Sequence, residues 1–304
     1  FGIPAACTGA MKHCIQKTVD HITTRVQFGK KLEEFGNVQE KLVEMISKLY
    51  ATESIVYMLS SNMDRGIKEY QLEAAIGKVL ASESAWHVCD DAIQVHGGMG
   101  FMRETGLERV LRDLRIFRIF EGANDVLRLF IALTGAQHAG KHLAVQASGV
   151  GGLIGLAVSR VTGGNTGSNF GQVVDASLQD SAKALDQQIA LFGQTVQGLL
   201  MKHKKGIIDR QYEMHRVANA AIDIYSSAAV LSRATYAIKN KSSSADFERK
   251  VATYYVDKAM RSSNRYLKDA GSASENAAKV ATIESLAKEV CGNGGLTLQH
   301  PVEL

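Results

Sequence analysis

The chain of 304 residues has 45% hydrophobic and 22% charged residues, the composition of an ordinary globular protein. Its formal net charge of +4 suits an anionic ligand or surface but is too weak to indicate a nucleic-acid-binding protein. Only two prolines occur, Pro4 and Pro301, so we expect uninterrupted helices through the interior.

The cysteines show neither metal-ligand nor disulfide spacing. Cys7, Cys14, Cys89 and Cys291 form no CxxC pair and have no paired histidines near them, so we expect free thiols and no metal site.

No signal peptide and no run of about eighteen apolar residues is visible. Because the sequence begins at Phe1 without a methionine, we expect a fragment or a processed product.

Apolar residues at three-to-four spacing predict five helices in the first half of the chain, over 5–27, 38–62, 70–95, 105–119 and 125–139. Gly29 is expected to stop the first helix, and the glycines at 97–100 separate the third helix from the fourth. Five amphipathic helices with short connections predict an antiparallel bundle.

The second half begins with a glycine-rich stretch and then returns to a helical pattern. Residues 146–171 are expected to form a linker and a candidate membrane-contact segment, and helices are expected over 174–205, 209–240, 246–270 and 276–291. No strand alternation is evident. The predicted fold is therefore all-α, a helical bundle (1–145) followed by a second helical bundle (172–304).

The stretch from Arg112 to Arg128 is the first place to look for chemistry. It places one carboxylate, Glu121, at a break between two helices, next to Phe120 and Gly122. An apolar cleft at such a break would favour a general base. An ordinary helix-end carboxylate has the same surroundings, so the residue pattern alone leaves both interpretations open.

Three other features also allow two interpretations each. The arginines at 109, 112, 115 and 118 could follow phosphates or form a solvated face paired with local acids. The loop His96–Phe101 could admit a pyrophosphate to its backbone, although it does not match the dinucleotide fingerprint. Lys202–Lys205 could be a solvated helix turn or could contact an anionic membrane.

Four motifs occur in an order that resembles the C-terminal helical domain of acyl-CoA dehydrogenases. They are Arg25-x-x-Phe28-Gly29, Gln94-x-His96-Gly97-Gly98-Met-Gly100-Phe101, Arg112-Asp-x-Arg115 and Ile119-Phe120-Glu121-Gly122. The continuation after residue 145 is similar to the very-long-chain branch of this family, in Leu199–Gly206 and Tyr225–Ala234. A paralogous branch acts as an assembly factor for respiratory complex I, and Ala132–Gly140 resembles that branch as well.

The resemblance implies a role for each matching residue. Glu121 would be the catalytic base that removes the α-proton of a fatty acyl-CoA thioester, with Phe120, Glu121 and Gly122 contacting the substrate. The residues implied in FAD binding are Arg25, Phe28, Gln94, Val95, His96, Gly97, Gly98, Ala123, Asn124 and Asp125. Two departures from the family pattern are Ala123, where a threonine is common, and Gly36, where many shorter-chain members carry glutamine.

The resemblance further implies a mitochondrial enzyme of β-oxidation that acts on long and very long acyl chains. Its expected partners are fatty acyl-CoA, electron-transferring flavoprotein, a second subunit in a homodimer and, through the C-terminal extension, the matrix side of the inner membrane. The given sequence does not contain the family's N-terminal and middle domains, so we expect this chain to be inactive alone. The alternatives are a non-catalytic assembly scaffold on the same fold and a generic helical interaction module.

Overall fold

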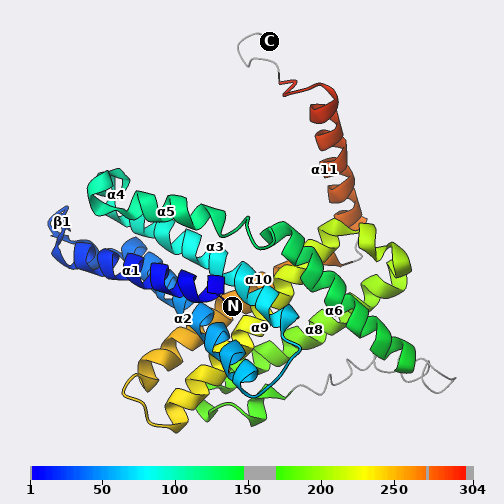
Figure 1. Cartoon of the computed structure of the whole chain (residues 1–304), viewed down its shortest axis with the longest axis horizontal. Coiled ribbons are helices and arrows are strands. Elements are labelled where there is room, and N and C mark those ends of the chain that lie inside the picture. Colours follow the sequence, from blue (N-terminus) through cyan, green and yellow to red (C-terminus); the bar gives the residue numbers. More distant parts are fainter. Residues whose placement is uncertain (1, 147–168, 272–273, 299–304) are drawn as a thin grey trace.

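The computed structural model describes residues 2–146, 169–271 and 274–298, and these ranges are almost entirely helical (Figure 1). This confirms the all-α fold class. Pro4 lies within the first turn of its helix, where the backbone N–H groups have no intrahelical acceptor. The one proline in the described ranges therefore interrupts no helical hydrogen bond.

The first half contains the five predicted helices. They are α1 (Gly2–Thr24), α2 (Gly36–Asp64), α3 (Gln71–His96), α5 (Leu107–Ile116) and α6 (Asn124–Gln146), with the short α4 (Gly98–Phe101) between α3 and α5. Two 3₁₀ turns, η1 (Leu32–Glu34) and η2 (Arg103–Thr105), complete the connections. The prediction over 105–119 was too long, because α5 ends at Ile116 and tight turns continue to Phe120.

The end of the first helix differs from the prediction. α1 stops at Thr24, and a two-stranded antiparallel hairpin follows, β1 (Val26–Gln27) and β2 (Lys30–Lys31). Its two turn residues, Phe28 and Gly29, have φ of 51° and 82°. Two consecutive positive φ values are the geometry of a primed hairpin turn. Gly29 therefore turns the hairpin instead of ending the helix, and strands of two residues are too short to produce a visible alternation.

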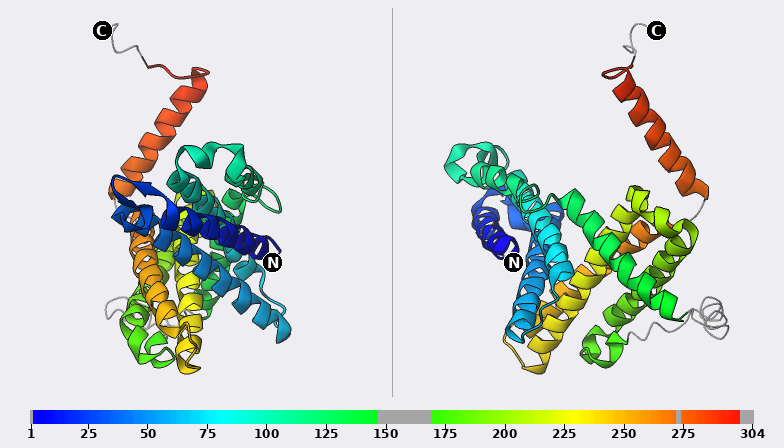
Figure 2. Two further views of the ribbon diagram at one scale, coloured as in Figure 1. Left: turned by 90° about the vertical axis from the view of Figure 1, so that its left-hand side faces the viewer. Right: turned by 45° about the vertical axis from the view of Figure 1, so that its right-hand side comes forward.

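The second half contains the four predicted helices, α8 (Gln179–His203), α9 (Gln211–Lys239), α10 (Ala245–Ala270) and α11 (Ser274–Gly292). Three 3₁₀ turns flank α8, namely η3 (Phe170–Gln172), η4 (Ala176–Leu178) and η5 (Lys204–Asp209). α9 and α10 pack along each other, whereas α11 projects away from the body (Figure 2). Its exposed apolar side chains include Ile283 and Leu286.

The two halves share a hydrophobic core. One cluster joins Ile55, Val79 and Ile131 of the first half to Met214 and Val217 of the second, all with less than 5% of their surface exposed. Fully burying such a side chain contributes about 1.5–3 kcal/mol. A second cluster packs α2 against α8, α9 and α10, and a third fills the space between α1, α3 and α5. α9 of the second half therefore packs directly against α2 and α6 of the first half.

The predicted domain boundaries stay a prediction. Most of the expected linker, residues 147–168, lies outside the described residues, and so does the candidate membrane-contact segment within it. Among the helices that are described, none combines the length and the apolar character needed to span a bilayer.

Candidate active site

The residues predicted to bind cofactor and substrate fall into two regions at opposite ends of α5. One region is the tip formed by the β1–β2 hairpin and the turn between α3 and α4, and the other is the junction between α5 and α6 (Figure 1). α5 has 10 residues and is therefore about 15 Å long. Arg25 and Phe28 follow the end of α1, which contacts the end of α3 through His21 and His96, whereas Phe120–Asp125 lie at the other end of α5.

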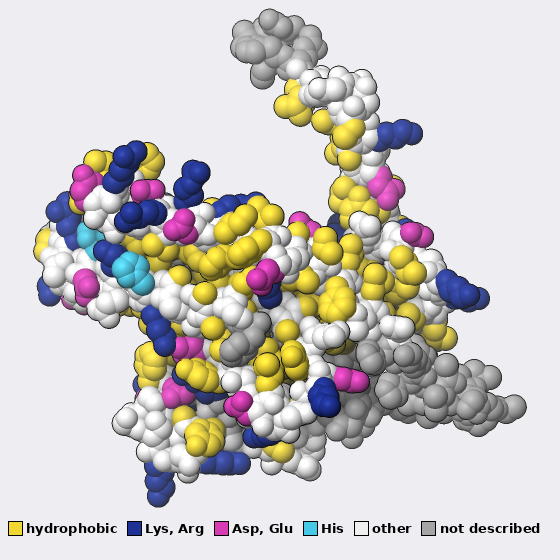
Figure 3. Space-filling view, in the orientation of Figure 1, with side chains coloured by type: hydrophobic (Ala, Val, Ile, Leu, Met, Phe, Trp, Pro, Cys, Tyr) yellow, Lys and Arg dark blue, Asp and Glu magenta, His cyan; other side chains and the backbone are white. Residues whose placement is uncertain are grey.

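The tip is held together by a pair of stacked histidines. His21 of α1 and His96 of α3 stack with ring centroids 4.3 Å apart, and His96 Nδ1 donates to the carbonyl oxygen of Ala92 at 2.7 Å. Burial lowers the pKa of His21, and the nearby His96 and Arg25 lower it further. Arg25 itself is exposed, and several Lys and Arg side chains gather at this end of the molecule (Figure 3).

Glycines shape the backbone of the tip. Gly97 has a φ of 58°, and Gly97 and Gly98 are exposed with open space where a Cβ would stand. A Cβ on Gly100 would lie 2.3 Å from the carbonyl oxygen of Ile93, so only glycine fits there. Gly97 N donates to the carbonyl oxygen of Gln94 and Gly97 O accepts from Gly100 N, so of these two glycines only Gly98 keeps an N–H without a protein acceptor in the described ranges. Phe28 is 94% exposed and has ring contact with Phe35 at a centroid distance of 6.5 Å.

The α5–α6 junction places Glu121 on a strained turn. Glu121 has a φ of 52° and Gly122 a φ of 98°, and left-handed backbone is unfavourable for a residue with a side chain. Phe120 stacks on Phe117 with a centroid distance of 5.3 Å and keeps 38% of its surface exposed. The Glu121 side chain is exposed as well. The described residues thus confirm the helix break but do not by themselves enclose the carboxylate in an apolar cleft.

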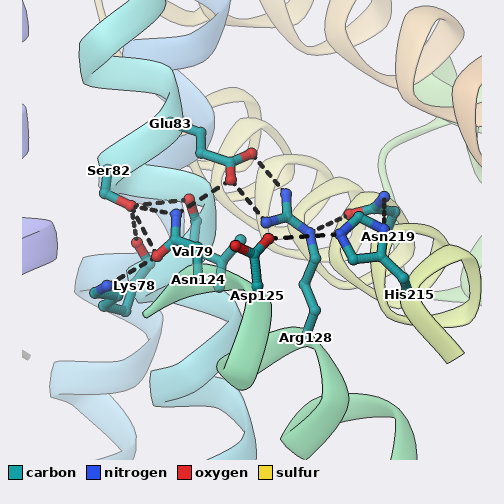
Figure 4. A network of polar contacts seen from close by, with 9 residues as sticks. All are labelled: Lys78, Val79, Ser82, Glu83, Asn124, Asp125, Arg128, His215 and Asn219. Atoms are coloured by element: carbon teal, nitrogen blue, oxygen red, sulfur yellow. Dashed lines mark hydrogen bonds and ion pairs between the residues drawn. The ribbon is translucent and has the colours of Figure 1, made fainter. Parts of the chain in front are cut away.

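Behind this turn lies a network of buried polar groups (Figure 4). Lys78 Nζ donates to the carbonyl oxygen of Gly122 and to Asn124 Oδ1, each at 2.8 Å. Asn124 Nδ2 donates to Ser82 Oγ at 3.0 Å and to Glu83 Oε1 at 3.1 Å. Asn124 is only 4% exposed and its side chain is hydrogen-bonded within the chain. A cofactor at this position would therefore contact the backbone of Asn124 and not its side chain.

The network continues through an ion pair into α9. Arg128 donates to both carboxylate oxygens of Glu83, at 2.7 and 2.6 Å, and its Nε donates to Asn219 Oδ1 at 2.6 Å. Asn219 Nδ2 in turn donates to His215 Nδ1 at 3.4 Å, and His215 Nε2 lies 4.0 Å from Asp125 Oδ1. Bidentate pairing of this kind combines strength with a fixed geometry.

The charges of the network stabilise one another. Burial alone would raise the pKa of Glu83, but the hydrogen bonds and the charge of Arg128 outweigh it, so the pKa lies below the ordinary range. Burial lowers the pKa of Lys78, and the negative groups around it offset part of that effect. Burial also lowers the pKa of His215, helped by the charge of Arg128.

A polar cleft of about 400 Å³ opens beside the network, between α6 and α9. Ala123, Asn124 and Asp125 of the predicted cofactor segment line it. So do Arg115 and Arg118 of the arginine row, for which no ion pair with Glu108 or Asp113 occurs within the described part of the chain. Arg109 and Arg112 do not line the cleft, so the interpretation of the row as one that follows phosphates stays a prediction.

The sequence assigned no role to Lys78, Glu83, Arg128 or Asn219. A signal was nevertheless present, because Lys78 lies on the apolar stripe of α3 next to Val79 and one turn after Ala75, which are both buried. A lysine at such a position is seldom buried without a partner. Across the ranges that the structure covers, no cluster of histidine, cysteine and carboxylate side chains could hold a metal ion.

Known proteins resemble the chain along its whole length. A family model described as "Acyl-CoA dehydrogenase, C-terminal domain" matches residues 1–135. The very long-chain specific acyl-CoA dehydrogenase of Rattus norvegicus is 42% identical over 314 residues, which cover 100% of this chain and 48% of the rat protein. The chain belongs to the acyl-CoA dehydrogenase family. The resemblance inferred from the four sequence motifs is thereby confirmed.

The second half of this acyl-CoA dehydrogenase chain has its own match. A family model described as "ACAD9/ACADV, C-terminal domain" covers residues 176–296. The very long-chain specific enzyme of Homo sapiens is 44% identical over 272 residues, or 86% of this chain and 42% of the human protein. The chain therefore spans about half the length of these relatives.

The fold of this family member also occurs in a solved structure. The acyl-CoA dehydrogenase of Bacillus anthracis, crystallised in complex with FAD, aligns with a TM-score of 0.75 and 22% identity over 98% of this chain and 51% of its own. At that identity the comparison shows the fold alone. It supports the arrangement of both helical halves.

Proposed function

We propose that the protein carrying this chain is an FAD-dependent dehydrogenase of long- and very-long-chain acyl-CoA thioesters. The observation that carries the proposal is the 42% identity over the whole chain to the very-long-chain enzyme. The position of Glu121 on a strained turn between α5 and α6 adds to it. In this proposal the chain supplies the catalytic base and part of the cofactor site, and the remaining walls come from parts that the relatives have and this chain does not cover.

Glu121 would accept the α-proton of the substrate. Such a proton is weakly acidic, so its removal requires a positioned carboxylate and stabilisation of the developing negative charge on the thioester oxygen. In the described residues the backbone N–H of Glu121 donates to no protein acceptor, which leaves it free to donate to that oxygen. Phe120 and Gly122, on either side, would contact the acyl group.

The tip fits a phosphate-bearing cofactor. Arg25 offers an exposed guanidinium, and the absence of a Cβ at Gly97 and Gly98 lets a pyrophosphate approach the backbone, where the Gly98 N–H has no protein acceptor in the described ranges. Phe28, almost fully exposed, would find an apolar contact there. FAD, when bound, supplies the acceptor for the hydride that leaves the β-carbon.

A homodimer is proposed for the intact protein. The family resemblance assigns the tip and the α5–α6 junction to cofactors that are bound across two subunits, and the placement of the two regions at opposite ends of α5 is compatible with that assignment. Electron-transferring flavoprotein is the proposed acceptor of the electrons. None of the relatives described above is named for an assembly role.

A peripheral contact with a membrane is proposed for the turn between α8 and α9. Met201 and Ile208 are 53% and 62% exposed there, and the basic residues Lys202, Lys204 and Lys205 are exposed beside them. Exposed apolar and basic side chains within one short turn suit an anionic bilayer. Because the relatives are named as mitochondrial enzymes, the proposed surface is the matrix side of the inner mitochondrial membrane.

The test is the absorption spectrum of the full-length protein that contains this chain. We expect a bound-flavin spectrum that palmitoyl-CoA and longer thioesters bleach under anaerobic conditions, whereas butyryl-CoA has little effect. A protein that retains no flavin, or whose flavin no acyl-CoA of any length reduces, would contradict the proposed function.

A further inference from the structure

The turn that carries Glu121 has few hydrogen bonds of its own. Phe120 N donates to the carbonyl oxygen of Ile116 at 3.0 Å, and Asn124 N donates to that of Arg118 at 3.0 Å. Between these two bonds, the backbone N–H groups of residues 121–123 bond to nothing in the described ranges. Glu121 adds strain because its φ of 52° is left-handed, whereas Gly122 adopts its φ of 98° without a steric penalty. Such a turn needs support from outside its own backbone.

Lys78 provides this support directly. Its side chain, in a residue only 6% exposed, reaches from α3 and donates to the carbonyl oxygen of Gly122 at 2.8 Å. The same ammonium group donates to Asn124 Oδ1 at 2.8 Å, so one cation connects both sides of the turn. The bond to Asn124 is buried and the bond to Gly122 is part-buried, so water cannot replace the first of them cheaply.

The second half of the chain completes the arrangement. Asn124 donates a hydrogen bond to Glu83, and Glu83 accepts from Arg128. Arg128 Nε in turn donates to Asn219 Oδ1 of α9 at 2.6 Å. Arg128 is only 8% exposed. A buried ion pair stabilises a protein only when all of its remaining hydrogen-bonding groups are satisfied. Without Asn219, Arg128 would lose one of its three protein acceptors.

We propose that the network of Lys78, Ser82, Glu83, Asn124, Arg128 and Asn219 holds the Glu121 turn in its strained conformation. Lys78 is a positioning residue, and α9 fixes the network from the other half of the chain through Asn219. The helical extension thereby contributes to catalysis without touching the substrate. The catalytic consequence rests on the proposed function of Glu121, whereas the order of the turn does not.

Two variants in the full-length protein test the network, Lys78→Met and Asn219→Leu, which keep the side-chain size and remove the hydrogen bonds. The control is Gln188→Met, because Gln188 is 7% exposed and its Nε2 bonds to Ser263 Oγ at 3.0 Å between α8 and α10, away from the turn. Hydrogen exchange measured by mass spectrometry reports the order of residues 119–126. Kinetics with palmitoyl-CoA report kcat and KM separately.

Within residues 119–126, we expect exchange of the hydrogen-bonded amides of Ile119, Phe120 and Asn124 to become about tenfold faster in both test variants and to stay unchanged in Gln188→Met. Because a small displacement of a catalytic group slows the chemical step, kcat should fall by about 10- to 100-fold while KM stays within about threefold. If Lys78→Met does not fold, Asn219→Leu decides, since Asn219 lies at the partly exposed end of the network.

Unchanged exchange in residues 119–126 in the variants that fold would overturn the proposal, and so would an equal effect of Gln188→Met. Faster exchange with an unchanged kcat would overturn the catalytic part. A full-length protein without dehydrogenase activity would contradict the proposed function instead, and the exchange rates would still decide whether the network orders the turn.

Discussion

Gly122 occupies a position that no other residue suits. Its φ is 98°, and a Cβ there would lie 3.1 Å from Leu127 Cδ2. Gly122→Ala should therefore destabilise the protein by about 1–3 kcal/mol and displace Glu121. The control is Gly193→Ala in the middle of α8, where a Cβ meets nothing within 4 Å and a gain of about 0.5–1 kcal/mol is expected. Urea unfolding measures both changes, and equal stabilities of the two variants would contradict this account.

Glu44 connects α2 to α10 and should make stability depend on pH. Burial would raise its pKa, but hydrogen bonds from Lys258, Tyr254 and Lys48 outweigh burial and lower the pKa to about 2. Because the pKa is depressed in the folded state, the stabilisation is complete above the ordinary glutamate pKa of about 4.3. It is lost as the pH falls from there towards about 2.

Glu44→Gln should therefore lower the free energy of unfolding by about 2 kcal/mol at pH 7 and by less at pH 3. Denaturant titrations at the two pH values measure the difference from the parent protein. Glu40→Gln, at an exposed position on the same helix, is the control. A difference of the same size at both pH values would refute the role of Glu44.

For single residues, the sequence predicted the position of Glu121 at a helix break, because aromatic, glycine and capping residues are local signals. It did not predict the partners of Asn124. Its partners Lys78 and Glu83 lie 46 and 41 residues away in sequence, and Asn219, which bonds to Arg128, lies 91 residues from that arginine. Only the packing of α3 and α9 against α6 brings these residues together.

The turn between α8 and α9 is the element for which a membrane role can be tested. Met201→Ser with Ile208→Ser removes the exposed apolar side chains, which are 53% and 62% exposed, and leaves the lysines in place. Binding to cardiolipin-containing vesicles should weaken by about tenfold or more. The control pair is Met63→Ser with Ile67→Ser, whose side chains are exposed at the end of α2. If the two double variants bind vesicles with equal affinity, another surface of the protein contacts the membrane.

Helices were predictable as elements, because their apolar residues repeat every three to four positions and proline is absent from their interiors. Short elements were not predictable from the sequence. The β1–β2 hairpin has two residues in each strand, and its turn places Phe28, an atypical residue, at positive φ. A search for Asn-Gly or Asp-Gly would not have found it.

On the scale of the whole molecule, the shared core predicts that the two halves unfold together. Met214 of α9 is 2% exposed and belongs to the cluster that includes Ile55 and Ile131 of the first half. Met214→Ala should cost about 2–5 kcal/mol and shift a single calorimetric transition to lower temperature. Met201→Ala, at an exposed position, is the control. Two resolved transitions, of which only one shifts, would show that the halves are independent.

This shared core was not evident from the sequence, where the glycine-rich stretch suggested two separate bundles. The apolar stripes of α2, α6 and α9 identify which residues are buried but not which stripe faces which. The likeness of both halves to one family of enzymes agrees with their close packing.

The most direct test of the central claim is the reduction of flavin in a Glu121→Gln variant of the full-length protein. Glutamine keeps the size of the side chain but accepts no proton at neutral pH, so we expect a normal flavin content and a rate of bleaching by palmitoyl-CoA about 10²- to 10⁴-fold below that of the parent. Glu104→Gln, an exposed carboxylate of η2, should behave as the parent does. Bleaching of the Glu121→Gln flavin within about tenfold of the parent rate would show that another residue is the base.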